Sequence, residues 1–548
     1  MKNLSILGGF TRSIQRSMAC SVAGLVHSTR HSFSTLREDP EMDQLMEFLE
    51  NLKNFEKSGV PKGAGTDSED GFDLGRMRRL MGLLGNPQSM FKTVHIAGTK
   101  GKGSTAAFLS SILRAEGYSV GCYTSPHVQT IRERITFGRW GELVSAKKLN
   151  HHFNTRREIL ERAVKLENGC LSHFEVFTAI AFSLFAEENT EIAVVEVGLG
   201  GARDATNVIV GPDLAISIIT TVGEEHLDAL GGSLESIAVA KSGIIKNGRP
   251  LVLGGPFIPS IEYILRSKAS SMSSPVVSAC DPGNRSALRG FCEVSGIPRQ
   301  LCDIVLHIEK DFDLSIELLG VKLRMLGAHQ LQNAVTATCA ALCLNKQGWS
   351  LSSGSIRAGL EGAIFQGRTQ VLSSEEASLL GVPGATILLD GAHTKESARA
   401  LTNTLQMTFP KAKMVLVVAM ANDKNHLGFA RELLSVGNLA AVFSTEVDIA
   451  GAKSRLTSAS LLKCAWANAS REMNMKVLDL KVADSEDQSL QAAGIVESQS
   501  ILLAEGSLLA CIRAGFKILS ERTAEQPGII VVTGSLHIVS AVLGYLHS

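Results

Sequence analysis

Short apolar runs rich in β-branched residues alternate with helical patterns along most of the chain. The first half predicts a helix at 104–116 and strands at 93–97, 119–123, 192–197, 214–220 and 251–254. The second half predicts helices at 396–409 and from residue 535, and strands at 386–390, 414–419, 439–444 and 528–533. Such alternation is typical of α/β folds with mostly parallel sheets. We therefore expect two α/β domains, 41–361 and 372–548, joined by a hinge at 362–371.

Other stretches are less regular. An apolar face between residues 41 and 52 predicts a helix, and the following segment 57–68 is rich in Gly and Lys, which is typical of a loop. The serine-rich run 267–274 is interpreted as a surface loop. The stretch from 275 to about 309 gives no clear pattern.

Composition excludes several classes of protein. Of the 548 residues 45% are hydrophobic, which is not the composition of a disordered chain. The 54 basic residues balance 54 acidic ones, so the net charge gives no reason to expect nucleic-acid binding. No apolar run approaches the ~18 residues of a membrane span. The ten cysteines form no C-x-x-C pair, and Cys339 and Cys343, one helical turn apart, are interpreted as core. We expect a monomeric enzyme with no nucleic-acid or membrane partner.

The first 37 residues have a composition of their own. They contain seven serines, five basic residues and no acidic residue, and the first acid is Glu38. An Arg- and Ser-rich, acid-poor opening is typical of an organelle transit peptide, although a disordered tail is the alternative. Because arginines dominate, a mitochondrial address over 1–37 is favoured over a plastid one, and we expect the enzyme in the matrix. The rest of the chain is mildly acidic.

A glycine-rich turn between a predicted strand and helix is the strongest chemical signal. It reads Gly98-Thr-Lys-Gly101-Lys102-Gly103-Ser104. Glycines let backbone N–H groups converge on a phosphate, the helix N-terminus adds positive potential, and Lys102 can reach terminal phosphates. The common G-x-x-x-x-G-K-[ST] pattern is not matched in full, because Ile96 occupies the first glycine position and Gly103 follows the lysine. We interpret the turn as a polyphosphate site, with a purely structural turn as the alternative.

Four further polar residues lie at or after predicted strands or in an apolar helix. Ser125 and His226 follow strands, Glu196 lies inside an apolar strand, and Lys241 lies in an apolar helix. A carboxylate in a buried strand is unfavourable unless a cation offsets it. Taken singly, Ser125 could make a turn, His226 could be a core or cap histidine, and Lys241 could extend to solvent. Together they predict Mg²⁺ held by oxygen ligands and nucleotide phosphates.

These motifs, in this order, resemble those of the folylpolyglutamate synthase/dihydrofolate synthase family of Mur-type ATP-dependent ligases. The resemblance covers roughly 41–548, and its segments are 72–76, 84–88, 95–104, 123–127, 132–135, 174–178, 195–201, 204–207, His226, 241–244, 326–330, Asn333, 367–368, 390–393 and 533–536. It implies a Mur-ligase-like α/β fold with an N-terminal P-loop ATPase domain and a C-terminal Rossmann-like domain.

The resemblance also implies roles for individual residues. The expected ATP-binding residues are Thr99, Lys100, Gly101, Lys102, Gly103, Ser104, Asn333, Arg368 and Asp390. The expected Mg²⁺ ligands are Ser125, Glu196, His226 and Lys241, the last as an N-carboxylated side chain. The expected catalytic residues are Lys102, His226, Lys241 and His393. The expected pterin-binding residues are Asp73, Ser172, His173, Phe174, Glu175, Arg203, Asp204 and Ala205, although Arg203 is shifted by one place from the family's usual arginine.

The activity that the resemblance implies is ATP- and Mg²⁺-dependent amide formation in folate biosynthesis. L-Glutamate would be joined to 7,8-dihydropteroate, through an acyl phosphate, to give dihydrofolate. The alternatives are extension of the glutamate tail of tetrahydrofolates and, from a different class, a non-catalytic nucleotide-binding protein. Tail-extending eukaryotic members typically have Phe-Arg where this chain has Phe174-Glu175. The sequence is therefore more similar to members with dihydrofolate synthase activity, such as those of plant mitochondria.

Overall fold

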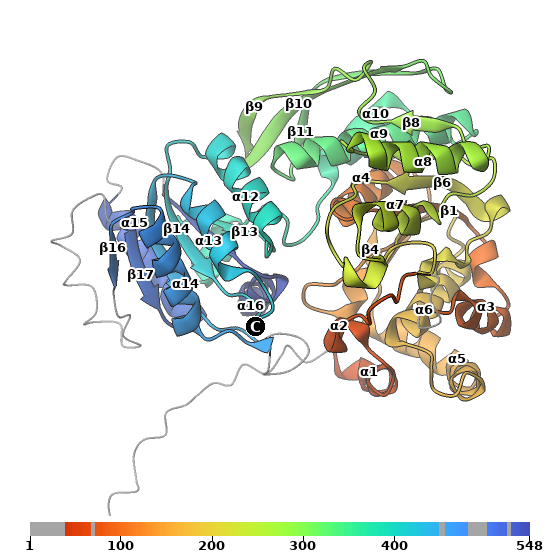
Figure 1. Cartoon of the computed structure of the whole chain (residues 1–548), viewed down its shortest axis with the longest axis horizontal. Helices are drawn as coiled ribbons and strands as arrows, with labels where there is room; N and C mark the ends of the chain where they lie inside the picture. Colours follow the sequence, from red (N-terminus) through yellow and green to blue (C-terminus); the bar gives the residue numbers. More distant parts are fainter. Residues whose placement is uncertain (1–38, 67–71, 449–454, 480–500, 523–527, 548) are drawn as a thin grey trace, which may run out of the picture. The chain divides into compact units, whose positions relative to one another are not determined.

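The computed structural model describes residues 39–66, 72–448, 455–479, 501–522 and 528–547. The predicted transit peptide 1–37 lies outside the described residues. Over the described ranges the chain forms an eight-stranded sheet, a three-stranded sheet and a seven-stranded sheet (Figure 1). None of the helices in these ranges is long and apolar enough to cross a membrane.

The N-terminal sheet has the strand order β4-β3-β2-β5-β1-β6-β7-β8. Its parallel strands are β1 (Lys92–Ala97), β2 (Val120–Tyr123), β5 (Ile192–Glu196), β6 (Leu214–Ile219), β7 (Leu251–Leu253) and β8 (Val276–Ser278), and β3 (Ile135–Phe137) and β4 (Glu142–Leu143) form an antiparallel edge. Apart from Lys92, every residue of the parallel strands is buried. Both faces of the sheet are therefore covered, which explains the continuous apolar runs.

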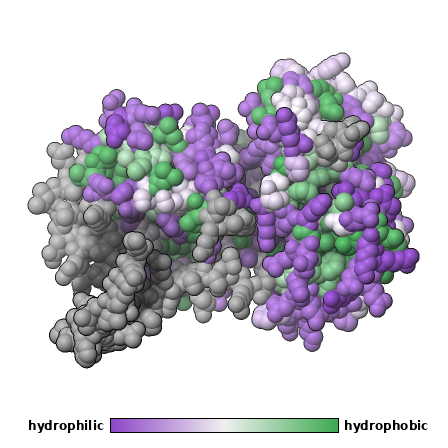
Figure 2. Space-filling view, turned by 60° about the horizontal axis from the view of Figure 1, so that its bottom comes forward, coloured by the Kyte–Doolittle hydropathy of each residue, from purple (hydrophilic) through white to green (hydrophobic). Residues whose placement is uncertain are grey.

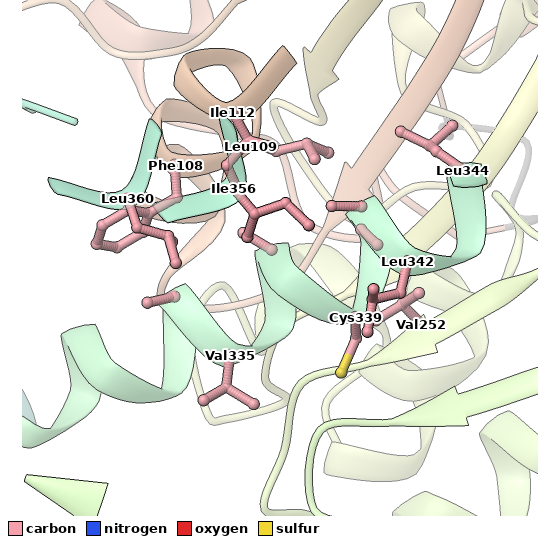
Figure 3. Packing of buried hydrophobic residues seen from close by; sticks show 14 of the residues in the cluster. Phe108, Leu109, Ile112, Val252, Val335, Cys339, Leu342, Leu344, Ile356 and Leu360 are labelled. Atoms are coloured by element: carbon pink, nitrogen blue, oxygen red, sulfur yellow. The ribbon is translucent and has the colours of Figure 1, made fainter. Parts of the chain in front are cut away.

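Helices cover both faces of this sheet. They are α1 (Asp43–Glu50), α3 (Leu74–Leu83), α4 (Lys102–Ala115), α5 (Ala146–Leu166), α6 (His173–Glu187), α7 (Leu234–Ser242), α8 (Pro259–Ser271), α9 (Ala328–Lys346) and α10 (Ser353–Gly362). Figure 3 shows part of one core, to which α4 contributes Phe108 and Ile112, α9 contributes Val335 and α10 contributes Ile356. A Cβ on Gly359 would overlap the backbone of α4, so α4 and α10 pack closely. The expected core positions Cys339 and Cys343 are fully buried.

One expectation for the middle of the chain needs correction, and two elements were not predicted. The serine-rich run at 267–274 was expected to be a loop, but α8 continues to Ser271. Ile261, Leu265 and Ala269, four residues apart, bury one face of α8, and Ser267, Ser270 and Ser271 lie on the exposed side. The unassigned stretch after it forms an antiparallel sheet of β9 (Ala287–Val294), β10 (Ile297–Ile308) and β11 (Leu314–Leu323). The short helix α2 (Phe55–Ser58) was also not expected.

The C-terminal sheet has the strand order β12-β13-β18-β14-β15-β17-β16. Its parallel strands are β13 (Thr386–Leu389), β14 (Lys413–Val418), β15 (Leu439–Ser444), β16 (Val477–Asp479), β17 (Ile501–Glu505) and β18 (Gly528–Thr533), and β12 (Gln370–Val371) pairs antiparallel with β13. One face packs against α12 (Lys395–Thr408), α13 (His426–Leu434) and α14 (Ala459–Glu472). The other packs against α11 (Ser374–Leu379), α15 (Leu508–Arg522) and α16 (Leu536–His547). This is the expected Rossmann-like arrangement.

The described surface on one face of the molecule is mainly polar (Figure 2). On the face drawn in Figure 2, hydrophilic residues cover most of the described surface, and hydrophobic residues are interspersed among them in small groups. Scattered exposed apolar residues are normal for a folded domain and carry no functional signal by themselves. The candidate chemistry lies instead at the carboxyl ends of the parallel strands.

Candidate active site

The glycine-rich turn joins β1 to α4 and is fixed to the end of β6. The N–H of Thr99 donates to the carbonyl O of Thr221 (2.9 Å), and the hydroxyl of Thr220 donates to the carbonyl O of Lys100 (2.6 Å). Gly101 has φ +85°, and a Cβ there would overlap Oδ1 of Asn333, so the position requires glycine. Among the described side chains none caps the first turn of α4, which leaves its N–H groups free for an anion.

Two lysines and a carboxylate gather around this turn. Lys102 Nζ donates to the carbonyl O of Gly98 (3.1 Å) and lies 3.7 Å from Oε1 of Glu196. Lys241 Nζ donates to the same Gly98 carbonyl (2.9 Å). Lys241 is only 4% exposed, so it does not extend to solvent. The register that pairs Ile96 with Glu196 puts the carboxylate beside the phosphate turn.

Burial shifts the charge states of these groups. It raises the pKa of Glu196, while the charge of Lys102 and the hydrogen bond from the N–H of Ser125 to Oε2 (3.2 Å) oppose the rise. It lowers the pKa of Lys241 to about 7, and the nearby charge of Lys102 adds to this shift. Shifts of this size are common where charged ligands bind. The structure thus brings together Lys102, Ser125, Glu196 and Lys241.

His226 lies in the loop that follows β6 and has φ +56°, which is unusual for a residue other than glycine. Burial lowers its pKa; the charge of Glu225 opposes this shift, and the charges of Lys102 and Lys241 add to it. Its neighbour Glu225 forms an ion pair with Lys100 of the phosphate turn. The Glu225–Lys100 pair, which fixes the His226 loop against the turn, was missed because the two residues are 125 positions apart.

The residues present fit Mg²⁺ only together with phosphate oxygens. In the part of the chain that the structure describes, no three His, Cys, Asp or Glu side chains gather into a set that could hold a metal ion. Glu196 supplies a buried carboxylate beside Ser125, and both are oxygen donors of the kind that Mg²⁺ prefers. The ion would complete its shell with nucleotide oxygens and with a carboxylated Lys241.

The candidate nucleotide residues of the C-terminal half also meet. Asp390 follows β13, where its Oδ1 accepts from the N–H of Ala392 (2.9 Å). Burial raises the pKa of Asp390, and the charge of Arg368 opposes the rise. The Arg368 guanidinium lies 5.8 Å from the centre of the Phe365 ring. His393 Nδ1 bonds to the carbonyl O of Gly391 (2.9 Å), which fixes the direction of its ring.

Two of the candidate pterin residues form a helix cap. Ser172 Oγ accepts from the N–H of Glu175 (3.2 Å), and Glu175 Oε2 accepts from the N–H of Ser172 (2.8 Å). This reciprocal arrangement is the capping box of α6, and the S-x-x-E spacing is the sequence signal from which it could have been predicted. Arg76 Nε lies 3.4 Å from the other oxygen of Glu175. Both side chains are therefore already engaged.

Of the two aromatic residues beside this cap, Phe174 is more accessible than His173. The Phe174 ring lies 6.2 Å from the Tyr123 ring, and a Cβ on Gly198 would overlap it. His173 is buried and stacks on Phe177, and burial lowers its pKa to about 4. Phe174 is thus the member of the 172–175 group whose ring borders the glycine-rich loop after β5.

The remaining candidate pterin residues hold local structure. Asp204 is buried and accepts from the N–H of Leu199 (2.7 Å) and from the hydroxyl of Thr206 (2.5 Å). Ala205, also buried, begins the short 3₁₀ helix η4 (Ala205–Val208). Arg203 donates to the carbonyl O of Phe72 (2.9 Å), next to Asp73, which caps α3. The shifted arginine therefore reaches the segment that contains Asp73.

Comparison with known proteins identifies the family. Residues 96–254 match the Mur ligase middle domain. The dihydrofolate synthase/folylpolyglutamate synthase of Bacillus subtilis (strain 168) is 32% identical over 370 residues, which are 67% of this chain and 79% of that protein. This chain belongs to the dihydrofolate synthase/folylpolyglutamate synthase family.

A further sequence relative and a solved structure support membership of this family. The dihydrofolate synthetase of Saccharomyces cerevisiae (strain ATCC 204508 / S288c) is 29% identical over 355 residues, which are 64% of this chain and 76% of that protein. The folylpolyglutamate synthase of Thermotoga maritima superposes with a TM-score of 0.68 at 29% identity, covering 92% of this chain and 96% of that one. The expected Mur-ligase-like fold is confirmed.

Proposed function

We propose that the protein is an ATP-dependent ligase that joins L-glutamate to 7,8-dihydropteroate and gives dihydrofolate. The observation that carries the proposal is the group of Lys102, Ser125, Glu196 and Lys241 around the phosphate turn. In a chain of this family, such a group is suited to hold the phosphates of ATP with Mg²⁺. The ligands of the ion would be Ser125, Glu196, His226 and the carboxylated Lys241.

The chemistry follows from the weakness of a carboxylate as an acyl donor. Transfer of the γ-phosphoryl group of ATP to the pteroate carboxylate gives an acyl phosphate and ADP, and the glutamate amine then displaces phosphate to form the amide. Phosphoryl transfer needs positioning and charge stabilisation more than covalent catalysis. Lys102 and the N–H groups at the start of α4 would hold the γ- and β-phosphates, with His393 near them. Bound Mg²⁺ would supply additional neutralisation of phosphate charge.

The remaining candidate residues would orient the substrates. Asn333, Arg368 and Asp390 would hold the nucleoside, and Phe174 would offer a face for stacking on the pterin. We also propose the domain boundaries 41–361 and 372–548, with 362–371 as the hinge, because the eight-stranded and the seven-stranded sheets belong to different clusters of buried apolar residues. Closure about this hinge would exclude water, which would otherwise hydrolyse the acyl phosphate.

The acceptor is inferred from the charge around α6. Glu175 and Arg76 form a neutral pair where tail-extending eukaryotic members typically have an arginine in place of Glu175. Dihydropteroate carries a single carboxylate and has no glutamate tail, so it needs no extra positive charge here. Tetrahydrofolates carry further carboxylates that an arginine would attract. We therefore favour dihydropteroate, with tail extension of tetrahydrofolates as the second candidate activity.

The deciding experiment uses protein without residues 1–37, supplied with ATP, Mg²⁺ and glutamate. Dihydropteroate and tetrahydrofolate are compared as acceptors by measuring phosphate release and the mass of the product. We expect ligation to dihydropteroate, and ligation to tetrahydrofolate alone would overturn this choice. ATP binding without phosphate release in the presence of either acceptor would favour a non-catalytic protein.

We propose the mitochondrial matrix as the location, because residues 1–37 are basic, serine-rich and free of acids. A fluorescent protein fused to residues 1–37 should enter mitochondria. A fusion in which Arg12, Arg16 and Arg30 are replaced by Glu should remain outside. We also propose that the enzyme acts as a monomer, which sedimentation of the mature chain would test.

A further inference from the structure

A buried arginine closes the loop that carries Ser125. Arg134 is 1% exposed, and its guanidinium donates to both carboxylate oxygens of Glu56 (2.9 and 2.6 Å). Its Nε donates to Nδ1 of His127 (3.0 Å), and its carbonyl O accepts from the N–H of Thr124 (3.1 Å). Arg134, at the end of segment 124–134, therefore holds the start of the same segment through Thr124 and His127. Ser125 lies inside it, next to Glu196.

The rest of this loop is fixed from within, whereas Arg134 depends on a distant residue. Glu133 accepts from the N–H groups of Val128 (2.7 Å), Gln129 (2.9 Å) and Thr130 (3.0 Å). Arg134 instead pairs with Glu56, which is 78 positions away and lies on α2. The position of Ser125 thus depends on a carboxylate supplied by another part of the chain.

The segment that carries Glu56 touches the other parts of the candidate site as well. We call residues 53–66 the strap. The carbonyl O of Lys53 accepts from the N–H of His173 (2.9 Å), and the N–H of Gly63 donates to the carbonyl O of Asp228 (2.8 Å) in the His226 loop. A Cβ on Gly65 would overlap Leu230, so the strap lies directly against that loop. It connects the N-terminus of α6, the Ser125 loop and the His226 loop.

Glu56 neutralises the buried positive charge of Arg134. Burial alone would lower the pKa of Arg134, but the charge of Glu56 and, more weakly, that of Glu196 raise it. A buried guanidinium that loses its carboxylate partner is strongly unfavourable and moves toward water or another anion. Besides Glu56, Glu196 is a carboxylate whose charge acts on Arg134, and it is the carboxylate expected to bind Mg²⁺.

We propose that Glu56 is a positioning residue of the ligase, which holds Arg134 in place so that Ser125 and Glu196 remain available to Mg²⁺ and nucleotide. The inference rests on the proposed function, because it takes Ser125 and Glu196 as Mg²⁺ ligands. Glu56 does not touch the reacting atoms; it acts through Arg134 and His127. Its side chain is 43% exposed, so a glutamine of the same size can be accommodated there.

The test measures how Mg²⁺ supports nucleotide binding in the variant Glu56→Gln of the mature chain. Calorimetric titration with a non-hydrolysable ATP analogue, without acceptor, gives the Mg²⁺ concentration at half-maximal affinity. We expect this concentration to rise about tenfold, as for other residues that orient metal ligands. The matched control is Glu50→Gln, because Glu50 pairs only at the surface with Lys57 (3.9 Å) and should leave the Mg²⁺ dependence unchanged.

A purely structural role would lower the melting temperature without changing the Mg²⁺ dependence of the folded protein, and that result would overturn the proposal. Should Glu56→Gln fail to fold, Glu56→Asp supplies the comparison, since it keeps the charge but shortens the reach, and it should shift the Mg²⁺ dependence by a smaller factor. An unchanged dependence in Glu56→Asp would then overturn the proposal. Wild-type protein that binds nucleotide but ligates neither acceptor would contradict the proposed reaction alone, and the Mg²⁺ comparison would still decide the role of Glu56.

Discussion

Lys102 and Lys241 donate to the same acceptor, the carbonyl O of Gly98, at 3.1 and 2.9 Å. Two ammonium groups that share one carbonyl repel each other, and the more buried one is the less able to stay charged. Burial lowers the pKa of Lys241 to about 7, and the charge of Lys102 contributes. Above that pH Lys241 is largely a neutral amine at the edge of the phosphate turn.

A neutral amine is the form that reacts with CO₂, so we predict that Lys241 is carboxylated and that the extent rises as the pH increases through about 7. Protein held at pH 8 with ¹³C-bicarbonate should show a carbamate carbon by NMR. The signal should disappear in Lys241→Ala, and ligase activity should fall when CO₂ is removed. A signal that persists in Lys241→Ala would contradict the assignment.

Lys246 provides the matched control for this measurement. Burial lowers its pKa to about 8, and its Nζ donates to Oδ1 of Asn207 (2.8 Å), away from the phosphate turn. A carbamate persists when a cation binds it, and Lys246 is not among the expected Mg²⁺ ligands. Lys246→Ala should therefore keep the NMR signal of the wild-type protein.

Removal of the charged groups at the turn should abolish catalysis and leave the fold intact. We expect Lys102→Ala and Glu196→Gln each to lower kcat by about 10³-fold, since Lys102 would stabilise the transferring phosphoryl group directly and Glu196 would hold the Mg²⁺ that neutralises its charge. Circular dichroism and the melting temperature should remain close to those of the wild type. Lys92→Ala, at the exposed start of the same strand β1, is the control and should keep full activity. Near-normal turnover of either site variant would overturn the site.

Most strands of the two parallel sheets could be predicted because both of their faces are buried, although β8, β16 and β17 were missed. Ile192–Glu196 and Leu439–Ser444, for example, are almost wholly apolar runs of the length of a strand. The three-stranded sheet was missed although Leu314–Leu323 alternates buried and exposed residues, which is the pattern of a strand covered on one face. Ala287–Val294 contains no buried position and therefore lacks that pattern.

In the candidate site, too, some contacts could be predicted from the sequence and others could not. Ser125 and Glu196 could be placed together because the carboxyl ends of parallel strands meet at one edge of a sheet. The pairs Glu56–Arg134 and Lys100–Glu225 could not, because they join residues far apart in the chain and depend on how loops pack. Sequence patterns report local periodicity, whereas such ion pairs arise only from tertiary structure.

Buried histidines should make the protein less stable as the pH falls. Burial lowers the pKa of His95 to about 3 and that of His173 to about 4, from an ordinary value of 6.5. The unfolded chain therefore binds protons that the folded chain does not, so the stabilisation is complete above about pH 6.5 and is lost progressively below it. Each histidine should contribute about 1.4 kcal/mol per pH unit in that range.

Urea unfolding between pH 7.5 and 5.5 measures this slope. His95→Gln should reduce the pH dependence of the free energy of unfolding by the contribution of one histidine, because the substitution removes a buried group that must otherwise remain neutral. His151→Gln, on the exposed side of α5, should leave the slope unchanged. An equal slope in wild type and His95→Gln would show that His95 does not titrate in this way.

Alanine substitutions at two glycines with positive φ distinguish the effect of backbone strain from that of the geometry of the phosphate turn. Gly101 (φ +85°) faces Oδ1 of Asn333, which a Cβ would overlap, whereas a Cβ on Gly117 (φ +102°) would meet nothing within 4 Å. Alanine at either position should lower the free energy of unfolding by about 1 kcal/mol through strain. Gly101→Ala should in addition weaken nucleotide binding by at least about tenfold. The turn and Asn333 must move apart to accommodate the Cβ, so the N–H groups of the turn no longer point toward one phosphate. Equal nucleotide affinities of the two variants in calorimetry would show that the turn does not hold the phosphates.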